Sequence, residues 1–199
     1  MSLEELMSGD IIIGCRKNQD GYEEEFSFID ALSLDEIDRN YLLIHTGMVD
    51  VEDGDVRILD VTLKRGVSSR SLELFRQDFT RQDGTMPVFI VLRSRKNLGK
   101  LWIENARRHL GETYSCDFLE HEGSIYCAEL LQISCLDENG KDVFTREPMD
   151  FLSKDGSMPE FWTHMFSWVN SPVPQGMVGC NPRSIIHSNQ LVRTHLSLQ

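Results

Sequence analysis

Long apolar runs are missing from this sequence, and so is any excess of positive charge. No stretch reaches the roughly 18 apolar residues of a transmembrane helix, so a membrane span is not expected. Lys and Arg number 20 against 32 Asp and Glu, which gives a formal net charge of −12. A surface of that charge repels phosphate groups, and nucleic acid is therefore not expected as a partner.

Paired cysteine motifs are also missing. The five cysteines are an odd number at irregular spacing and include no C-x-x-C pair, so at least one thiol is unpaired and no disulfide framework is expected. The histidines show no H-E-x-x-H spacing, which argues against a dedicated zinc site. We therefore expect no dedicated zinc site. The cysteines are Cys15, Cys116, Cys127, Cys135 and Cys180.

The chain of 199 residues has the length of one domain, and a hydrophobic content of 40% is enough for a core. We expect a single domain over residues 1–199, with prolines breaking its C-terminal segment into short elements from about residue 140 onward. The first residues lack the basic start and apolar stretch of a secretory signal. A leader removed earlier would leave the same sequence, so a cytoplasmic protein and a trimmed periplasmic or secreted one both stay open. The sequence predicts no oligomeric state.

Four segments have the residue types of β-strands. Three consecutive isoleucines predict a buried strand near the N-terminus. Two apolar runs flank the dipeptide Asp53-Gly54, which is the pattern of a β-hairpin that turns at Asp-Gly. The predicted strands cover residues 11–13, 41–49, 56–61 and 87–93.

Apolar residues at helical spacing predict the helices. The clearest pattern runs over residues 98–110 and stops at Gly111. A second helix is predicted over residues 126–133, with Ser124 as its N-cap. Because strands lead and helices follow, the order of elements predicts an α+β fold. The remaining predictions are a helical stretch around residues 72–75, a short helix within residues 28–37 that ends near Asn40, and a polar loop at residues 19–25.

Cys127 is the first candidate for chemistry. It follows the expected N-cap by three residues, which puts its sulfur beside the free N–H groups and the positive end of the helix dipole. A thiolate, the reactive form of cysteine, is favoured there. The alternative is that Cys127 is one more small buried apolar residue.

His45 is the second candidate, because it interrupts an apolar strand where an imidazole needs a polar partner. If the hairpin turns tightly at Asp53-Gly54, Asp60 lies opposite Gly47 and is a diagonal neighbour of His45 on the same face. A carboxylate there orients the imidazole and stabilises its charged form, as a Cys–His nucleophile pair requires. The alternatives are a core histidine bonded to a backbone carbonyl and a solvent-facing Asp60. A register shifted by one residue would put Asp60 on the other face.

Several short motifs stand in a characteristic order. The sequence has Gly-Asp-Ile-Ile at 9–12, His-Thr-Gly-Met at 45–48, Gly-Val at 66–67, Leu-Glu-Leu-Phe at 72–75, Gly-Glu-Thr-Tyr at 111–114 followed by Phe118, Tyr-Cys-Ala-Glu-Leu at 126–130 and Asn-Pro-Arg-Ser-Ile at 181–185. This ordered set resembles the permuted papain-like cysteine hydrolases of the YiiX/YaeF type, in the NlpC/P60 superfamily. The resemblance covers most of the chain, and the histidine precedes the cysteine as it does in that family.

The resemblance implies a circularly permuted papain-like fold, with an antiparallel sheet packed against helices. It implies Cys127 as the nucleophile, His45 as the general base and Asp60, where the family commonly has Glu, as the third catalytic residue. The expected activity is cleavage of an amide bond in a small peptide-like substrate, such as one derived from the cell wall, through an acyl-enzyme and without a cofactor. The residues implied in substrate binding are Tyr114, Ser115, Tyr126 and Glu129.

Three positions depart from the pattern of the family. Ile44 precedes the histidine where Ser is common, Ser115 stands where Asp is usual, and Ala128 replaces a Ser after the cysteine. These departures leave the Cys–His pair intact. They bear on which substrate fits beside the nucleophile. Two alternative functions therefore stay open. One is a lipid ester or thioester hydrolase or acyltransferase, and the other is a papain-like domain that binds a ligand without turning it over.

Overall fold

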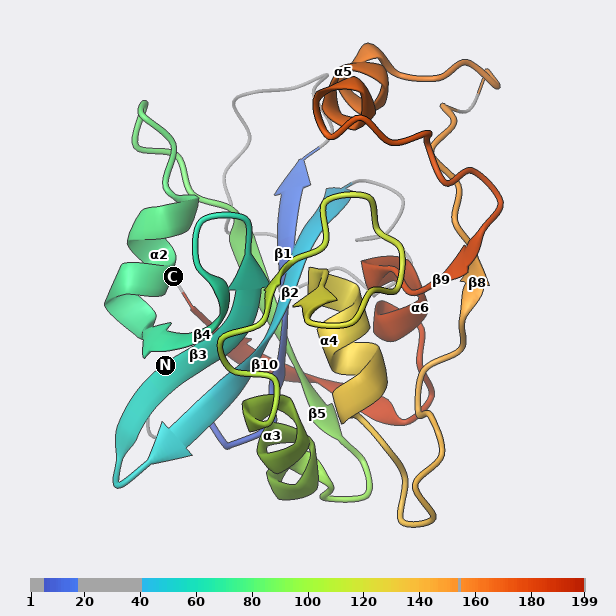
Figure 1. Ribbon diagram of the computed structural model, residues 1–199. Coiled ribbons are helices and arrows are strands. Elements are labelled where there is room, and N and C mark those ends of the chain that lie inside the picture. Colours follow the sequence, from blue (N-terminus) through green and yellow to red (C-terminus); the bar gives the residue numbers. More distant parts are fainter. Residues whose placement is uncertain (1–5, 18–40, 154, 199) are drawn as a thin grey trace.

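The structure is a computed structural model and describes residues 6–17, 41–153 and 155–198. A six-stranded sheet forms its centre. The strand order is β10-β5-β1-β2-β3-β4, and every neighbouring pair is antiparallel (Figure 1). Helices pack on both faces, which confirms the predicted α+β class. The strands are β1 Ile11–Lys17, β2 Tyr41–Glu52, β3 Asp55–Thr62, β4 Gly66–Ser71, β5 Val88–Ser94 and β10 Leu191–Ser197.

The hairpin formed by β2 and β3 has the predicted register. Gly47 pairs with Asp60. The turn between the strands contains Asp53 and Gly54, whose φ angles are both positive, at 51° and 84°. Gly adopts this backbone region freely, and Asp adopts it more readily than most residues. The Asp-Gly turn therefore fixes the pairing of the two strands.

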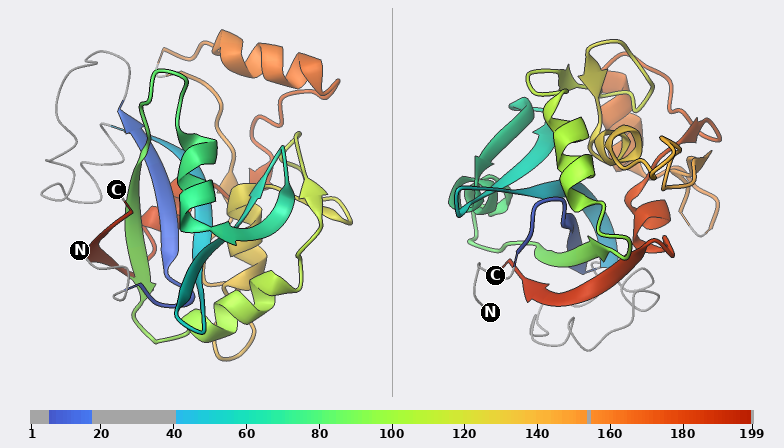
Figure 2. Two further views of the ribbon diagram at one scale, coloured as in Figure 1. Left: turned by 90° about the vertical axis from the view of Figure 1, so that its left-hand side faces the viewer. Right: turned by 90° about the horizontal axis from the view of Figure 1, so that it is seen from below.

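The central strand β1 is apolar because both faces of the sheet are covered. Ile11 and Ile13 pack in the core under α3 Gly99–Arg107 and α4 Cys127–Ser134. Ile12 points to the other face, where it packs in a cluster with residues of α2 Leu72–Phe79. Figure 2 shows the sheet between these layers. All three isoleucines are buried, as predicted.

Two predicted helix boundaries are wrong. The helix α3 ends at Arg107, because residues 108–111 form turns that finish at Gly111, where φ is 91°. Ser124 is not the N-cap of α4. It lies in β7 Ser124–Ile125, which pairs with β6 Thr113–Tyr114, and Tyr126 occupies the N-cap position.

The C-terminal segment is built of short elements, as its prolines predict. Two helices begin at or directly after a proline, α5 Glu160–Trp168 and α6 Pro182–Ile186. The strands β8 Glu147–Pro148 and β9 Val178–Gly179 pair with each other. Phe166 on α5 packs with Met149 and Phe151 in a cluster separate from the main core. The edge strand β10 was not predicted, and the predicted helix within residues 28–37 and loop at 19–25 lie outside the described residues.

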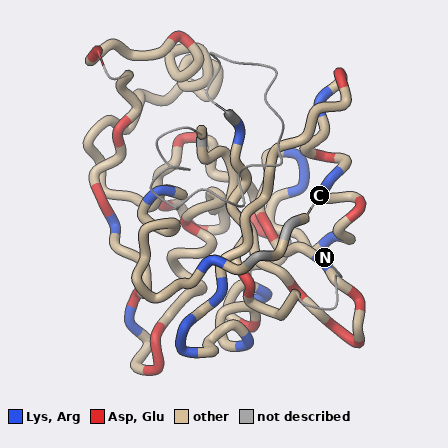
Figure 3. The backbone as a smooth tube through the Cα atoms, turned by 180° about the vertical axis from the view of Figure 1, so that it is seen from behind, with Lys and Arg blue, Asp and Glu red and all other residues tan. Residues whose placement is uncertain are grey.

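Charges of both signs are spread along the described chain rather than gathered in one block (Figure 3). Within the same residues, no helix combines the length and apolar character needed to cross a bilayer.

Candidate active site

The predicted contact between His45 and Asp60 is present. Their side chains come from β2 and β3, and His45 Nε2 lies 2.7 Å from Asp60 Oδ2. Gly47, directly opposite Asp60, leaves room for this carboxylate, because a Cβ atom there would lie 3.1 Å from Asp60 Cβ. Both side chains are buried, so the contact is shielded from solvent.

Cys127 reaches the same place from the start of α4. Its thiol interacts with the side chain of His45, and the backbone amide of Thr46 also lies close to the sulfur. Since His45 Nε2 bonds Asp60, the other ring nitrogen, Nδ1, is left for the thiol. Cys127 is the first residue of the helix, one position after the N-cap, so it does lie at the positive end of the helix dipole. The structure thus brings Cys127, His45 and Asp60 together in one chain of contacts.

The pKa values of His45 and Cys127 are shifted in the directions that favour an imidazolium beside a thiolate. Burial lowers the pKa of His45, but the hydrogen bonds with Asp60 and Cys127 outweigh it and raise that pKa to about 9. Burial also opposes ionisation of Cys127, yet the contacts with His45 and Thr46 bring the pKa of its thiol below the ordinary value. An imidazolium beside a thiolate is the reactive state of a Cys–His pair.

The other four cysteines behave differently. All five are free thiols. Burial raises the pKa of Cys15 and of Cys180 to about 12, and it raises the pKa of Cys135 as well. Burial and the nearby Asp117 carboxylate raise the pKa of Cys116. Cys127 therefore stands apart from the other thiols in its readiness to ionise.

Sequence reasoning missed Arg70 on β4. Its Nη2 donates to Asp60 Oδ2 over 2.5 Å, and its Nη1 donates to Asp78 at the end of α2. The register could have revealed it: Asp60 pairs with Ser68, so Arg70 is a diagonal neighbour of Asp60 on one side, just as His45 is on the other.

A cavity of about 280 Å³ opens beside His45. Its walls are mostly apolar and come from β3 with the turn after it, from α2, from the loop around residue 116 and from α5. The ring of Phe79 lies 4.6 Å from the His45 ring, measured between centroids. The lining residues are His45, Val61, Thr62, Leu63, Phe79, Tyr114, Cys116, Phe118, Met165, Trp168 and Val169.

Of the four residues implied in substrate binding, Tyr114 lines this cavity and the other three do not. The Tyr126 hydroxyl accepts a hydrogen bond from the Cys180 amide over 2.9 Å. Ser115 is buried and its hydroxyl donates to the Leu119 carbonyl at 2.9 Å. Their role in binding stays a prediction, and the contacts they make are internal.

Glu129 also has an internal contact, since its carboxylate accepts the Tyr126 amide over 3.2 Å and so satisfies one free N–H at the start of α4. Burial raises the pKa of Glu129 to about 7.

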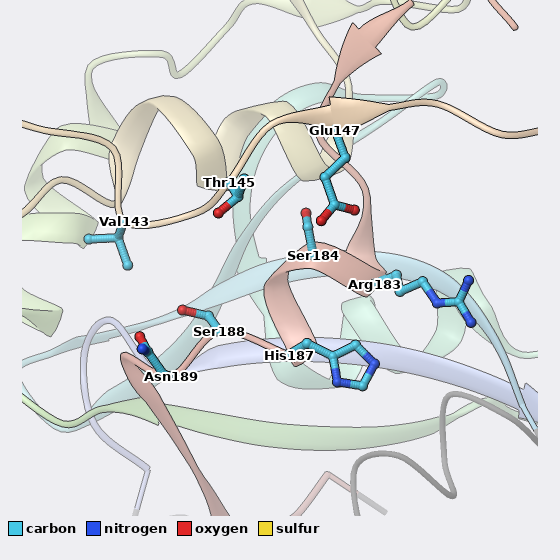
Figure 4. A pocket seen from close by; sticks show the side chains of 8 residues that line it. All are labelled: Val143, Thr145, Glu147, Arg183, Ser184, His187, Ser188 and Asn189. Atoms are coloured by element: carbon cyan, nitrogen blue, oxygen red, sulfur yellow. The ribbon is translucent and has the colours of Figure 1, made fainter. Parts of the chain in front are cut away.

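A second cavity, of about 400 Å³, lies beside α6 (Figure 4). It shares no lining residue with the first, and no cysteine lines it. The first cavity is the one that His45 lines, and Cys127 itself is not among the lining residues of either cavity. The residues around the second are Val143, Thr145, Glu147, Arg183, Ser184, His187, Ser188 and Asn189.

Comparison with known proteins gives a structural likeness. No family model and no curated protein matches the chain. Among solved structures, the metalloprotein YiiX from Escherichia coli O157:H7 superimposes with a TM-score of 0.63 and 16% sequence identity, over 96% of this chain and 97% of that chain. At this identity the likeness concerns the fold, and it establishes a YiiX-like fold for the whole chain.

Proposed function

We propose that the protein is a cysteine hydrolase with Cys127 as nucleophile, His45 as general base and Asp60 as the residue that orients the base. One observation carries the proposal. The thiol at the start of α4 contacts an imidazole whose other nitrogen is held by a buried carboxylate at 2.7 Å. This is the arrangement that activates sulfur for attack on a carbonyl carbon.

In the first half of the reaction, the thiolate of Cys127 attacks the carbonyl carbon of the substrate. The oxygen takes up negative charge, and free N–H groups in the first turn of α4 are suited to stabilise it. Protonated His45 then gives its proton to the leaving group as the carbon–leaving group bond breaks. An acyl-enzyme on Cys127 remains.

In the second half, His45 accepts a proton from water, and the hydroxide attacks the acyl-enzyme. The second tetrahedral intermediate collapses, releases the acid and returns the sulfur to the thiolate. Asp60 holds the imidazole throughout and balances its positive charge.

The motif order and the YiiX-like fold support membership of the permuted branch of the NlpC/P60 superfamily. The solved neighbour is described as a metalloprotein. Within residues 6–17, 41–153 and 155–198, no group of three or more His, Cys, Asp or Glu side chains is placed to hold a metal ion. The described residues therefore offer no donor set for a metal ion, and the proposed steps are assigned to protein side chains.

For the substrate, the first candidate is an amide bond in a small peptide-like molecule, as in relatives by superfamily. The apolar walls of the cavity favour a second candidate, an ester or thioester whose acyl part is apolar. Val61, Phe79 and Trp168 offer hydrocarbon and aromatic surface to such a group. Hydrolysis and acyl transfer share the same acyl-enzyme and differ in the group that releases it.

The first test is the rate of Cys127 alkylation as a function of pH, followed by mass spectrometry of the modified peptide. We expect a reactivity pKa below the value of about 8.5 for a free thiol, and we expect it to rise in His45→Ala. An ordinary pKa for Cys127 that is the same in wild type and His45→Ala would instead favour a domain that binds a ligand without turning it over.

Turnover is tested next with paired amide, ester and thioester substrates that carry short and long acyl groups. Cys127→Ser keeps the size of the nucleophile and is the matched control. We expect loss of turnover in this variant without loss of the fold, as measured by circular dichroism. Turnover that persists in Cys127→Ser would exclude Cys127 as the nucleophile.

A further inference from the structure

Arg70 is buried behind the candidate active site. Its side chain is 3% exposed and that of Asp60 is 0% exposed. The guanidinium is also enclosed by two aromatic rings of α2, with its central carbon 5.1 Å from the Phe75 centroid and 5.7 Å from that of Phe79. A guanidinium is costly to bury unless its charge is balanced. Two carboxylates balance it here, Asp60 and Asp78.

Asp60 has the same requirement. A fully buried carboxylate is costly unless a neighbouring cation and hydrogen-bond donors balance its charge. Two donors share its Oδ2, His45 Nε2 at 2.7 Å and Arg70 Nη2 at 2.5 Å. Its other oxygen, Oδ1, is buried and has no hydrogen-bond partner in the described part of the chain. The orientation of the carboxylate therefore depends on these two contacts.

The contacts form a line of alternating charge. From the surface inward, Arg65 and Arg70 both bond the Asp78 carboxylate, Arg70 bonds Asp60, and Asp60 bonds His45 beside the sulfur. Each buried charge has a neighbour of opposite sign. The strand β4 thus connects the proposed nucleophile to the ion pairs at the end of α2.

We propose that Arg70 is a positioning residue for the nucleophile, and that its guanidinium holds the Asp60 carboxylate aimed at the His45 imidazole. The inference rests on the proposed function. It assigns a role to a side chain that touches neither the sulfur nor the cavity, since it acts through Asp60 and His45. A purely structural ion pair between β4 and α2 would contribute to stability and leave the thiol unaffected.

The two roles differ in what they do to the titration of Cys127. Its titratable neighbours are His45 on β2, Tyr114 on β6, Tyr126 at the start of α4 and Cys180. Of these, His45 alone can carry a positive charge. Removing the positive charge of Arg70 destabilises the ionised form of Cys127 in two ways. Asp60 is then held less firmly against the His45 imidazolium, and one positive charge near the sulfur is lost. Both effects raise the pKa of Cys127.

The experiment compares Cys127 alkylation by iodoacetamide over a range of pH in wild type, Arg70→Met and Arg70→Lys. For Arg70→Met we expect the reactivity pKa to rise by about one, which lowers the fraction of Cys127 thiolate about tenfold at pH values below it. For Arg70→Lys, which restores the charge without the two-sided fork, we expect an intermediate value. The matched control is Arg65→Met, which removes the other arginine on Asp78 while leaving both hydrogen bonds of Asp60 in place. Because Arg65 acts on Asp60 only through its charge, we expect the Cys127 pKa in this variant to change much less than in Arg70→Met.

Several outcomes separate the hypotheses. A folded Arg70→Met protein with the wild-type thiol pKa and a lowered melting temperature would overturn the inference and leave a structural ion pair. If Arg70→Met does not fold, Arg70→Gln keeps a donor toward Asp60 without the charge, and an unchanged pKa in that variant also overturns it. A wild-type pKa that does not respond to His45→Ala would refute the proposed function itself.

Discussion

Selective alkylation of one thiol among five is the sharpest prediction of the structure. The protein is treated briefly with a small excess of iodoacetamide at pH 7, and each cysteine-containing peptide is quantified by mass spectrometry. We expect Cys127 to be modified first. Cys127 is partly exposed as a residue and the pKa of its thiol is lowered, whereas Cys15, Cys135 and Cys180 are buried and the pKa values of their thiols are raised.

The size of the preference follows from the pKa values. Burial raises the pKa of Cys15 and Cys180 to about 12, so about one molecule in 10⁵ carries a thiolate there at pH 7. Even a thiol with an ordinary pKa of about 8.5 is ionised to about 3%. The fraction of Cys127 present as thiolate is thus more than roughly 10³-fold larger than that of Cys15 or Cys180 at pH 7. A less basic thiolate is the weaker nucleophile, which leaves a net preference of about 50-fold or more.

Cys116 is the stringent comparison, because it is partly exposed and lines the cavity beside His45. Burial and Asp117 raise its pKa, so it should react after Cys127. Protein unfolded in urea is the control, in which all five thiols should react at similar rates. Modification of Cys116 at the same rate as Cys127 in the native protein would refute the reasoning, as would an unchanged Cys127 rate in His45→Ala.

Three further predictions concern stability and substrate. The raised pKa of His45, about 9, means that the imidazolium stabilises the folded state fully below pH of about 6.5 and loses this effect as the pH rises toward 9. The difference in unfolding free energy between wild type and His45→Gln should therefore shrink over that window by up to about 3 kcal/mol, as measured by urea unfolding. Burial raises the pKa of the Glu129 carboxyl to about 7, so the ionised carboxylate destabilises the folded state increasingly as the pH rises from about 4.5 to 7. Glu129→Gln should therefore increase the free energy of unfolding by up to about 3 kcal/mol at pH 8 and by little at pH 4.5. Equal increases at both pH values would contradict the burial argument. Trp168→Ala should lower kcat/KM for long acyl substrates about tenfold, from the loss of roughly 1–2 kcal/mol of apolar contact, whereas Phe161→Ala on the same helix, outside the cavity lining, should not.

The sequence was most informative where a short local pattern decides the geometry. Asp53 and Gly54 set the register of one hairpin, and that register predicts the contact between Asp60 and His45 without knowledge of the rest of the fold. The start of α4 was located to within a residue of Cys127, although the cap was misassigned. Periodicity and turn chemistry are local properties, so they are visible in one sequence.

Other parts depend on contacts between distant segments. β10 is a strand because β5 offers it an open edge, and the residues of β10 alone do not reveal that partner. Ser124 has the side chain of an N-cap, but its pairing in β7 with β6 places it before the helix. The wall that α5 adds to the cavity depends on how Met165 and Trp168 come to lie near β3, and no local pattern in the sequence predicts this.

The order of the site residues along the chain has a consequence for biosynthesis. His45, Asp60 and Arg70 lie on three successive strands joined by short turns, so the ribosome releases these three side chains as one local unit. Cys127 emerges later, and its thiol acquires its low pKa only when α4 docks on this sheet. A nascent or partly folded chain therefore carries five unactivated thiols. Full reactivity of Cys127 would then mark the completion of folding, and a newly made protein would be protected from premature oxidation or acylation until its own sheet is in place.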